Sequence, residues 1–480
     1  MQFVARVLSE AEQESIHTAS LRLLSEVGVR FHGAKALEIL AAHGAAVSHE
    51  DHLVKIPSEL VEQALRSAPR TVTFDARNPN LGFSMPSAWT GLGMDGTAAF
   101  TLDYQTGKRR YGTKKDIEQA MRVFQTLELG VMAWSPTCAS DAPAPSRPVH
   151  EFLDMLRYCS KHGEHELHRV DQVPYLVEGL KAIQGSEDAI RQHKIASLIY
   201  CPVAPLVHDG QMLDAYLELG PLDLPVMIMP MPVAGTTGPA SLYSNVVLAN
   251  SENLSAIVVY QLAHPGRPVV YSNAVGVVDF STGGFLAGST ETVLQSAALI
   301  SMGRFYNLPT TSTGCASDAK EPGPQAVLEK TISALPAFLS GADMIVGIGL
   351  IECSQSLVLE QMVVDHEIGR RCRRLRQGID SSESKDLFAD LAEIGPGGHF
   401  LARKSTRQAA RSGEFTVQGL ADRHPYEAWL ELGRPSVYSA ARTRVEEILA
   451  EPLVDPLPDE VNARLDDILR RADAELREED

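Results

Sequence analysis

The sequence predicts an α/β fold in which parallel strands alternate with helices and close into a barrel. Short apolar runs of strand length recur along the chain, and a helical segment follows each of the last four. Glycine and polar residues cluster after several strands, which favours a barrel over an open doubly wound sheet with one switch point. We expect three units: an α+β amino-terminal cap over 1–85, the barrel over 86–455 and a charged helix over 456–480.

The cap is predicted to begin with a helix. Ser9 with Glu12 three residues later matches a capping box, and apolar residues at helical spacing follow until Gly28 supplies a stop. Two shorter helices and two short strands complete the predicted cap. The helices are expected at 34–43 and 57–65, and the strands at 53–56 and 71–74.

The barrel is predicted from apolar runs whose length suits buried parallel strands. These runs lie at 131–135, 195–200, 226–231, 269–273, 308–312 and 344–348. The helical segments that follow the last four lie at 242–263, 290–306, 326–339 and 355–371. Such alternation requires right-handed crossover connections.

A glycine motif at 91–96, GLGMDG, matches the dinucleotide pattern G-x-G-x-x-G. The pattern binds a pyrophosphate only where a helix follows it. Here the next residues predict a hairpin that turns near 105–107. We therefore interpret the motif as a chance match.

Composition excludes several classes of function. The 480 residues include 43 Lys and Arg against 61 Asp and Glu, a net charge of −18, which disfavours nucleic-acid binding. No apolar stretch approaches the roughly 18 residues that a membrane span needs, and the first ten residues do not resemble a signal peptide. The six cysteines form no C-x-x-C pair. These features predict a cytoplasmic protein with reduced thiols.

One histidine cluster could bind zinc. In the segment YCSKHGEHELH, residues 158–168, one cysteine and three histidines recur every third residue. Gly163 opposes a stable helix there, so we interpret the segment as the polar end of a helix that starts near Glu151. We expect no metal and no organic cofactor to be bound directly.

A ligand site is predicted at the carboxyl ends of the strands, because loops rich in glycine and small residues follow them. The lining is expected from parts of 134–138, 200–208, 231–237, 271–279, 314–320 and 349–354. Aromatic rings near these strands suit a quaternary ammonium ion, which has no N–H to donate and is attracted to π faces. The candidate substrate-binding residues are Trp134, Tyr271, Asn273, Glu252, Gly314 and Glu352, and no catalytic residue is assigned.

Two other functions remain open at this point. Lys320 lies in one of the glycine-rich loops and could form a Schiff base in a barrel lyase. A protein that binds small cations without catalysis is the third possibility.

Six ordered segments resemble the trimethylamine methyltransferase family. They are KIPSELVEQALRSAPRTVTFDARNP, TLDYQTGKRRYGTKKDIEQA, STGGFLAGSTETVLQSAALI, TGCASDAKEPGPQAVLEKT, LVLEQMVVDHEIGRR and IGPGGHFLARKSTRQ. The resemblance implies a (β/α)8 barrel of the TIM type that moves a methyl group from a methylated amine to cobalt. The cobalamin (corrinoid) is then supplied on a partner protein.

The resemblance also implies the kind of amine. Founding members carry pyrrolysine in the loop that corresponds to 315–322, whereas this chain has only standard residues there. It therefore resembles the non-pyrrolysine branch, which demethylates quaternary amines such as glycine betaine. A quaternary ammonium departs as a neutral amine, so no general acid is required. We expect a corrinoid protein and a small quaternary amine as partners, assembly into a homo-oligomer, and no nucleic acid or membrane.

Overall fold

A closed ring of eight parallel strands forms the centre of the molecule. The computed structural model describes residues 4–416 and 419–477. The ring consists of β6 (Gly91–Gly93), β9 (Gly130–Trp134), β10 (His162–His165), β11 (Ala196–Tyr200), β13 (Val226–Ile228), β15 (Val269–Tyr271), β18 (Thr311–Thr313) and β19 (Met344–Val346). A parallel bridge between Tyr271 and Thr310 joins β15 to β18 and closes the ring.

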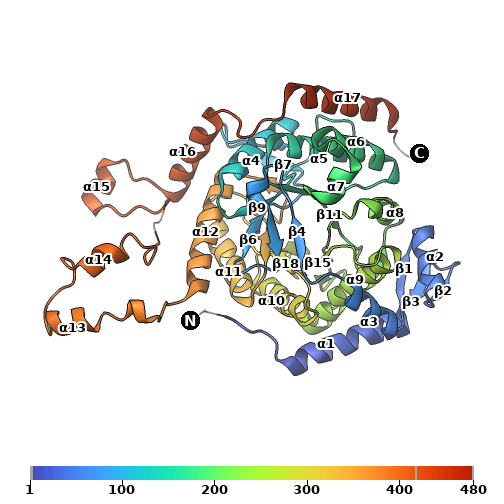
Figure 1. Ribbon diagram of the computed structural model, residues 1–480, viewed down its shortest axis with the longest axis horizontal. Helices are drawn as coiled ribbons and strands as arrows, with labels where there is room; N and C mark the ends of the chain where they lie inside the picture. The colour runs from blue at the N-terminus through green and yellow to red at the C-terminus, as the bar shows by residue number, and fades with distance from the viewer. Residues whose placement is uncertain (1–3, 417–418, 478–480) are drawn as a thin grey trace.

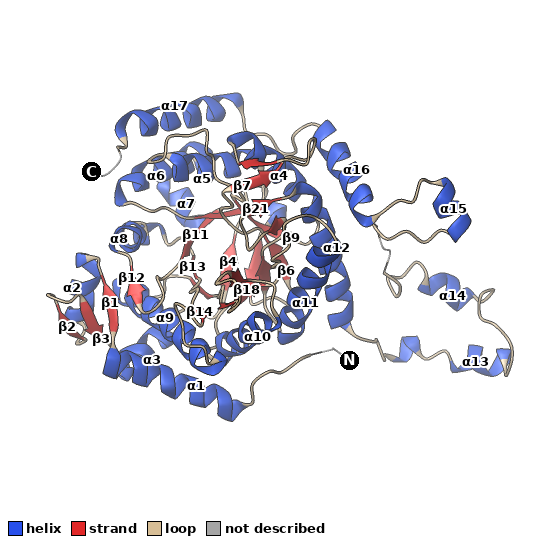
Figure 2. Ribbon diagram, turned by 180° about the vertical axis from the view of Figure 1, so that it is seen from behind, coloured by secondary structure: helices blue, strands red, loops and turns tan. Residues whose placement is uncertain are grey.

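Helices surround this ring (Figure 2). In chain order they are α4 (Lys114–Thr126), α5 (Arg147–Tyr158), α6 (Val173–Gln184) with the short α7 (Glu187–Gln192), α8 (Gly210–Glu218), α9 (Leu242–Ala263), α10 (Thr290–Phe305), α11 (Pro324–Ser340) and α12 (Leu359–Gln377). The predicted (β/α)8 barrel is confirmed. Helix α12 begins later than predicted, because β21 (Ser356–Leu357) pairs with β20 (Leu350–Ile351) just before it.

The histidine cluster is a strand, and its interpretation as the end of a helix is wrong. Helix α5 ends at Tyr158, and β10 pairs with β9 and β11 on its two sides. His162 is buried, with its ring nitrogens bonded to the Asp75 carbonyl oxygen and the Ser197 hydroxyl. Among the residues that the structure describes, no cluster of three or more His, Cys, Asp or Glu side chains could hold a metal ion.

The GLGMDG segment contributes the barrel strand β6 and is followed by the predicted hairpin. Its strands are β7 (Phe100–Leu102) and β8 (Arg109–Tyr111), and they extend the β20–β21 pair into one small sheet. A second small sheet combines β14 (Val233–Ala234), β16 (Gly276–Val278) and β17 (Phe285–Leu286). Both sheets are built from loops that follow barrel strands.

The amino-terminal cap contains the predicted helices and strands. They are α1 (Glu10–Arg22) continued by the π-helical turn η1 (Leu23–Val27), β1 (Val29–Phe31), α2 (Ala34–Ala42), β2 (Ala46–Ser48), β3 (Leu53–Lys55), α3 (Ser58–Ser67), β4 (Val72–Phe74) and β5 (Phe83–Met85). The capping box of Ser9 and Glu12 is present. Strand β12 (Val207–His208), from a barrel loop, pairs with β1, so the cap sheet includes part of the barrel unit.

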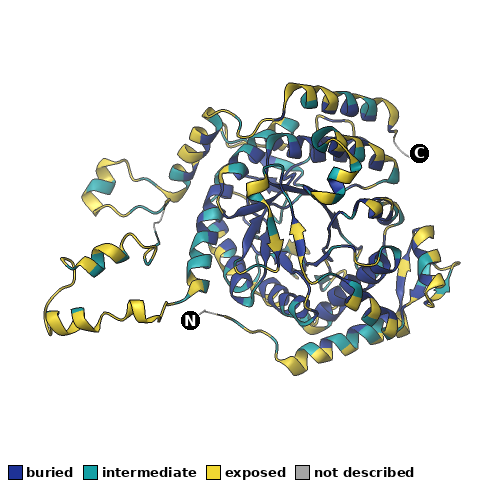
Figure 3. Ribbon diagram, in the orientation of Figure 1, coloured by how far each residue is buried: buried dark blue, intermediate teal, exposed yellow. Residues whose placement is uncertain are grey.

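An extended arm, residues 379–436, interrupts the carboxyl-terminal part of the barrel unit. It carries α13 (Phe388–Ile394), α14 (Lys404–Ala409) and α15 (Tyr426–Glu431) and projects away from the barrel (Figure 1). Its described residues are mostly exposed, in contrast to the barrel strands (Figure 3). The arm lies within 86–455, which was predicted as one barrel unit.

After the arm, α16 (Val437–Ala450) packs on α12, and α17 (Asp459–Glu475) packs on α6. The charged helix predicted over 456–480 is therefore present, although residues 478–480 lie outside the described part. The described part of the chain also contains four 3-10 turns: η2 (Pro79–Leu81), η3 (Val170–Gln172), η4 (Gly220–Leu222) and η5 (Glu383–Lys385). Within residues 4–416 and 419–477, no helix combines the length and the apolar character needed to cross a bilayer.

Candidate substrate cavity

A cavity of about 460 Å³ lies at the carboxyl ends of the barrel strands. Each of the eight strands contributes a lining residue at its last position or shortly after it. These residues include Asp95, Trp134, Glu166, Cys201, Met229, Ala274, Thr313 and Gly347. All six segments predicted to line the site contribute to it. This is the end of a parallel barrel at which ligand sites are generally found.

Two carboxyl groups line the cavity. Asp95 follows β6, and its oxygens accept hydrogen bonds from the Gly96 amide (3.1 Å) and the Ser354 hydroxyl (3.2 Å). Glu166 follows β10, and its Oε1 accepts a hydrogen bond from the Thr97 hydroxyl at 3.0 Å. The other oxygen of Glu166 is buried without a hydrogen-bond partner. Glu166 therefore contributes a carboxyl group to the cavity wall, while this oxygen itself is covered and lies 3.8 Å from His165 Nδ1.

The surroundings of these groups are acidic. Burial raises the pKa of Asp95 to about 6, and the nearby Glu166 contributes to this rise. His165 lies behind Glu166, with its Nε2 at 3.1 Å from Glu151 Oε2 and its Nδ1 at 3.8 Å from Glu166 Oε2. Burial alone would lower the pKa of His165, but Glu166 and Glu151 outweigh it and the pKa is raised. A cation in the cavity would be attracted by this cluster.

The rest of the wall is apolar and polarisable. The Trp134 indole lies against Gly96 so closely that a Cβ at that glycine would come within 2.1 Å of the indole nitrogen. That nitrogen, Nε1, is buried and donates no hydrogen bond. Phe285 and three methionines, Met212, Met229 and Met231, also line the cavity. Aromatic faces and thioethers suit the methyl groups of a quaternary ammonium ion.

Among the predicted site residues, Trp134 lies in the cavity and Tyr271 does not. The Tyr271 ring is fully buried in the helix layer, and its hydroxyl donates to Asn250 Oδ1 at 2.8 Å. Successive strand residues point to opposite faces, and Tyr271 points outward from the barrel. Asn273 is buried next to the cavity residue Ala274, and its Oδ1 accepts a hydrogen bond from Ser312.

The two predicted acidic partners of the cation also lie outside the lining. Glu252, on α9, accepts a hydrogen bond from the Leu206 amide at 2.9 Å, and burial raises its pKa to about 8. Glu352 accepts hydrogen bonds from Arg109 Nε at 3.0 Å and from the Ser356 hydroxyl at 2.6 Å. Glu252 therefore lacks a full negative charge at neutral pH, and the charge of Glu352 is already paired.

The loop that begins at Gly314 packs against the barrel. A Cβ at Gly314 would come within 2.7 Å of the Ile345 side chain, so this glycine allows close packing of β18 on β19. Lys320 is exposed outside the cavity lining, and its amine donates to the Asp318 carbonyl oxygen. The lysine suggested for Schiff-base chemistry thus does not face the cavity.

Asp95, Glu166 and His168 were not predicted to line the ligand site, although His168 belongs to the histidine cluster considered for zinc. Asp95 was considered only as part of a dinucleotide motif, and the other two follow the unrecognised strand β10. One signal was available: a carboxylate two residues after the glycine-rich run at 91–93 occupies the position where barrel site residues are found.

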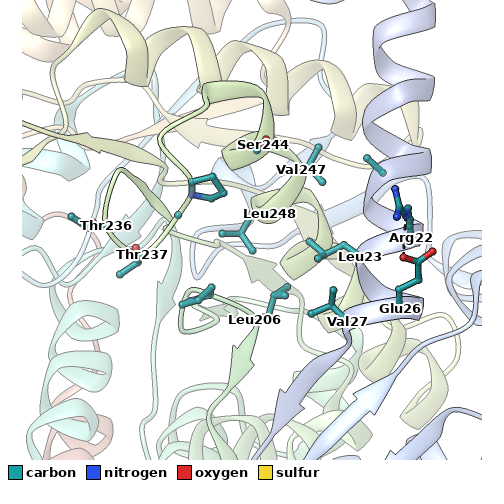
Figure 4. A pocket seen from close by; sticks show the side chains of 14 residues that line it. Arg22, Leu23, Glu26, Val27, Leu206, Thr236, Thr237, Ser244, Val247 and Leu248 are labelled. Atoms are coloured by element: carbon teal, nitrogen blue, oxygen red, sulfur yellow. Dashed lines mark hydrogen bonds and ion pairs between the residues drawn. The ribbon is translucent and has the colours of Figure 1, made fainter.

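A second hollow, of about 700 Å³, lies on the outside of the barrel (Figure 4). It is bounded by η1, the loops near Leu206 and Thr237, and the start of α9. Its only charged lining residues, Arg22 and Glu26, form an ion pair with each other at 3.0 Å. The two charges of this hollow therefore cancel, whereas Asp95 and Glu166 give the lining of the barrel cavity an excess of acidic groups.

The fold and the cavity define a (β/α)8-barrel protein whose site suits a small organic cation. The family model described as trimethylamine methyltransferase (MTTB) matches residues 3–477. This chain belongs to that family of methyltransferases.

Individual relatives agree with this assignment. Trimethylamine methyltransferase MttB of Methanosarcina barkeri is 31% identical over 476 residues, covering 97% of this chain and 95% of the relative. Glycine betaine methyltransferase of Desulfitobacterium hafniense (strain Y51) is 28% identical and covers 98% of both chains. The fold is also similar to the solved monomethylamine methyltransferase MtmB of Methanosarcina barkeri, with a TM-score of 0.51 at 12% identity over 94% of this chain and 89% of that one.

Proposed function

We propose that this protein transfers a methyl group from a quaternary amine to the Co(I) corrinoid of a partner protein. One observation carries the proposal: Trp134 and two carboxyl groups, Asp95 and Glu166, line one cavity at the mouth of the barrel. The relative named glycine betaine methyltransferase makes glycine betaine one of the donors to test.

The reaction requires no acid or base catalysis by the side chains of the protein. When the methyl carbon is attacked, its bond to nitrogen breaks, and the electron pair stays on nitrogen as a neutral tertiary amine leaves. The bound corrinoid would supply the Co(I) nucleophile. The residues of the cavity would hold the ammonium group, direct one methyl toward the mouth and exclude water. This task needs no proton transfer from a side chain of the lining.

The rim of the cavity suits a protein partner. Met231 and Phe285 line the cavity, and their side chains are 44% and 38% exposed. Phe280, whose ring lies close to Gly235, is 82% exposed. Apolar side chains exposed around a site are typical of an interaction surface. We propose that the corrinoid protein docks there. The cytoplasmic location and the homo-oligomer expected from the sequence remain part of the proposal.

The test is a methyl-transfer assay with a corrinoid protein reduced to Co(I). Glycine betaine, carnitine, choline, tetramethylammonium and trimethylamine are offered separately. The absorbance of methyl-Co(III) and the mass of the amine product are measured. We expect turnover with at least one quaternary amine and none with trimethylamine. Demethylation of trimethylamine as efficient as that of every quaternary amine would contradict the proposal.

A further inference from the structure

The charges in the cavity wall are all of one sign. Asp95 and Glu166 line it, and neither Lys nor Arg is among the lining residues. The only basic side chain there is His168, which is exposed at the rim. A carboxylate on the ligand would thus meet two like charges and no guanidinium or ammonium group.

The basic side chains behind the cavity wall are engaged with protein groups. His165, directly behind Glu166, has its Nε2 at 3.1 Å from Glu151 Oε2 and its Nδ1 at 3.8 Å from Glu166 Oε2. Lys330 is fully buried behind the wall, where its Nζ lies 2.8 Å from Asp365 Oδ2 and 2.7 Å from the Cys315 carbonyl oxygen. Arg109 forms an ion pair with Glu352 at 3.0 Å. These pairs leave neither Lys330 nor Arg109 available to a carboxylate inside the cavity.

Two buried polar atoms of the lining lack partners, and they differ in kind. Trp134 Nε1 is a donor, and Glu166 Oε2 is an acceptor. Both residues adjoin the same backbone turn, since the indole lies against Gly96 and Glu166 is bonded to Thr97. Both atoms are covered by protein, since the Trp134 nitrogen lies against Gly96 and Glu166 Oε2 lies 3.8 Å from His165 Nδ1. What the wall presents to a ligand is the negative charge of Asp95 and Glu166, which attracts a cation and repels a carboxylate.

We propose that the cavity selects quaternary ammonium ions with a net charge of +1, such as choline and tetramethylammonium, over zwitterionic betaines. The inference rests on the proposed function for the quaternary amine, and it narrows the substrate class. Glu166 is the residue that determines this selectivity, because it attracts the ammonium group and repels a carboxylate.

The test compares ligands of similar size by titration calorimetry on the isolated protein at pH 8. The probes are choline, tetramethylammonium, glycine betaine and 3,3-dimethylbutan-1-ol, the uncharged analogue of choline. We expect choline to bind at least about tenfold more tightly than glycine betaine and than the uncharged alcohol. Binding of glycine betaine as tight as that of choline would overturn the inference.

Substitution of Glu166 separates selectivity from folding. Glu166→Gln should weaken choline binding about tenfold or more while leaving glycine betaine binding unchanged or stronger. Glu50→Gln, at an exposed position of the cap, is the matched control and should change neither. Equal weakening of both ligands by Glu166→Gln, or no change in either, would contradict the assigned role.

The outcomes also distinguish the two proposals. If glycine betaine binds best and donates its methyl group to the corrinoid, the selectivity inference fails and the proposed function stands. If no quaternary ammonium ion binds, both fail.

Discussion

Trp134 is the residue on which cation binding in the cavity most depends. Its ring is 4% exposed, and its position is imposed by the close contact with Gly96. Its place at the end of a barrel strand made it predictable from the sequence. Asp95 and Glu166 were not predicted, because their importance arises only where loops after β6 and β10 meet. Tyr271 was predicted to bind the substrate but does not line the cavity. It also ends a barrel strand, but its side chain points into the helix layer.

Replacement of Trp134 tests this distinction. Trp134→Ala should weaken binding of a quaternary ammonium ligand by about 0.5–2 kcal/mol, or roughly 2- to 30-fold, because one cation-π contact is lost. Tyr271→Phe removes only the hydroxyl that donates to Asn250 and should leave affinity unchanged. Calorimetry on both variants is the measurement. A loss with Tyr271→Phe and none with Trp134→Ala would reverse the assignment.

Asp95 predicts a pH dependence of binding. Its pKa is raised to about 6, chiefly by burial, so the side chain gains a proton as the pH falls through that value. A bound cation favours the ionised form, and affinity should therefore be constant above about pH 7 and decline as the pH drops below about 6. Asp95→Asn should bind more weakly at pH 8 and lose this decline. An unchanged decline in the variant would assign the titration to another group.

At the scale of elements, burial explains why helix α9 was predicted and why strand β10 was not. Helix α9 is found at 242–263, as predicted. Strand β10 was missed because its sequence, HGEH, is polar although all four residues are buried. Several of its polar atoms bond to partners distant in sequence, for instance Glu164 Oε1 to the Ser197 hydroxyl at 3.0 Å, whereas Glu164 Oε2 and His165 Nδ1 have no hydrogen-bond partner. Periodicity within a short segment does not reveal such partners.

The buried pair of Lys330 on α11 and Asp365 on α12 joins two barrel helices to the floor of the cavity. Lys330→Met would leave Asp365 buried without its counter-ion, which typically costs about 3–5 kcal/mol of unfolding free energy. The double variant Lys330→Met/Asp365→Leu should recover part of that loss. Denaturant unfolding followed by circular dichroism measures both.

Lys115→Met, at an exposed position on α4, is the matched control for that series and should change stability by less than about 0.5 kcal/mol. A single variant at Lys330 as stable as this control would show that the buried pair contributes nothing.

At the scale of the whole molecule, the barrel and the arm differ in how far their residues are buried. The barrel strands are buried on both faces, whereas the arm exposes Phe388, Leu401 and Phe415 at 71%, 80% and 65%. The resemblance to a known family identified the barrel, and alternating strands and helices supported it. The arm was not predicted, because its short helices have no long-range periodicity that separates them from barrel elements.

The exposed arm predicts where a protease cuts first. Brief trypsin treatment should cleave after Arg407 or Arg411, in or just after α14, before any site in the barrel. Intact mass spectrometry of the fragments identifies the site. Protection of both arginines while barrel loops are cut would contradict an exposed arm and would indicate that another copy of the chain covers it.

The most direct test of the central claim is the position of a bound quaternary cation. Arsenocholine replaces the nitrogen of choline by arsenic, whose anomalous scattering marks that atom in a crystal. We predict a peak in the barrel cavity, within about 6 Å of the Trp134 ring and beside Glu166. A peak only in the outer hollow between Arg22 and Leu248, or none in the barrel cavity at saturating ligand, would contradict this account.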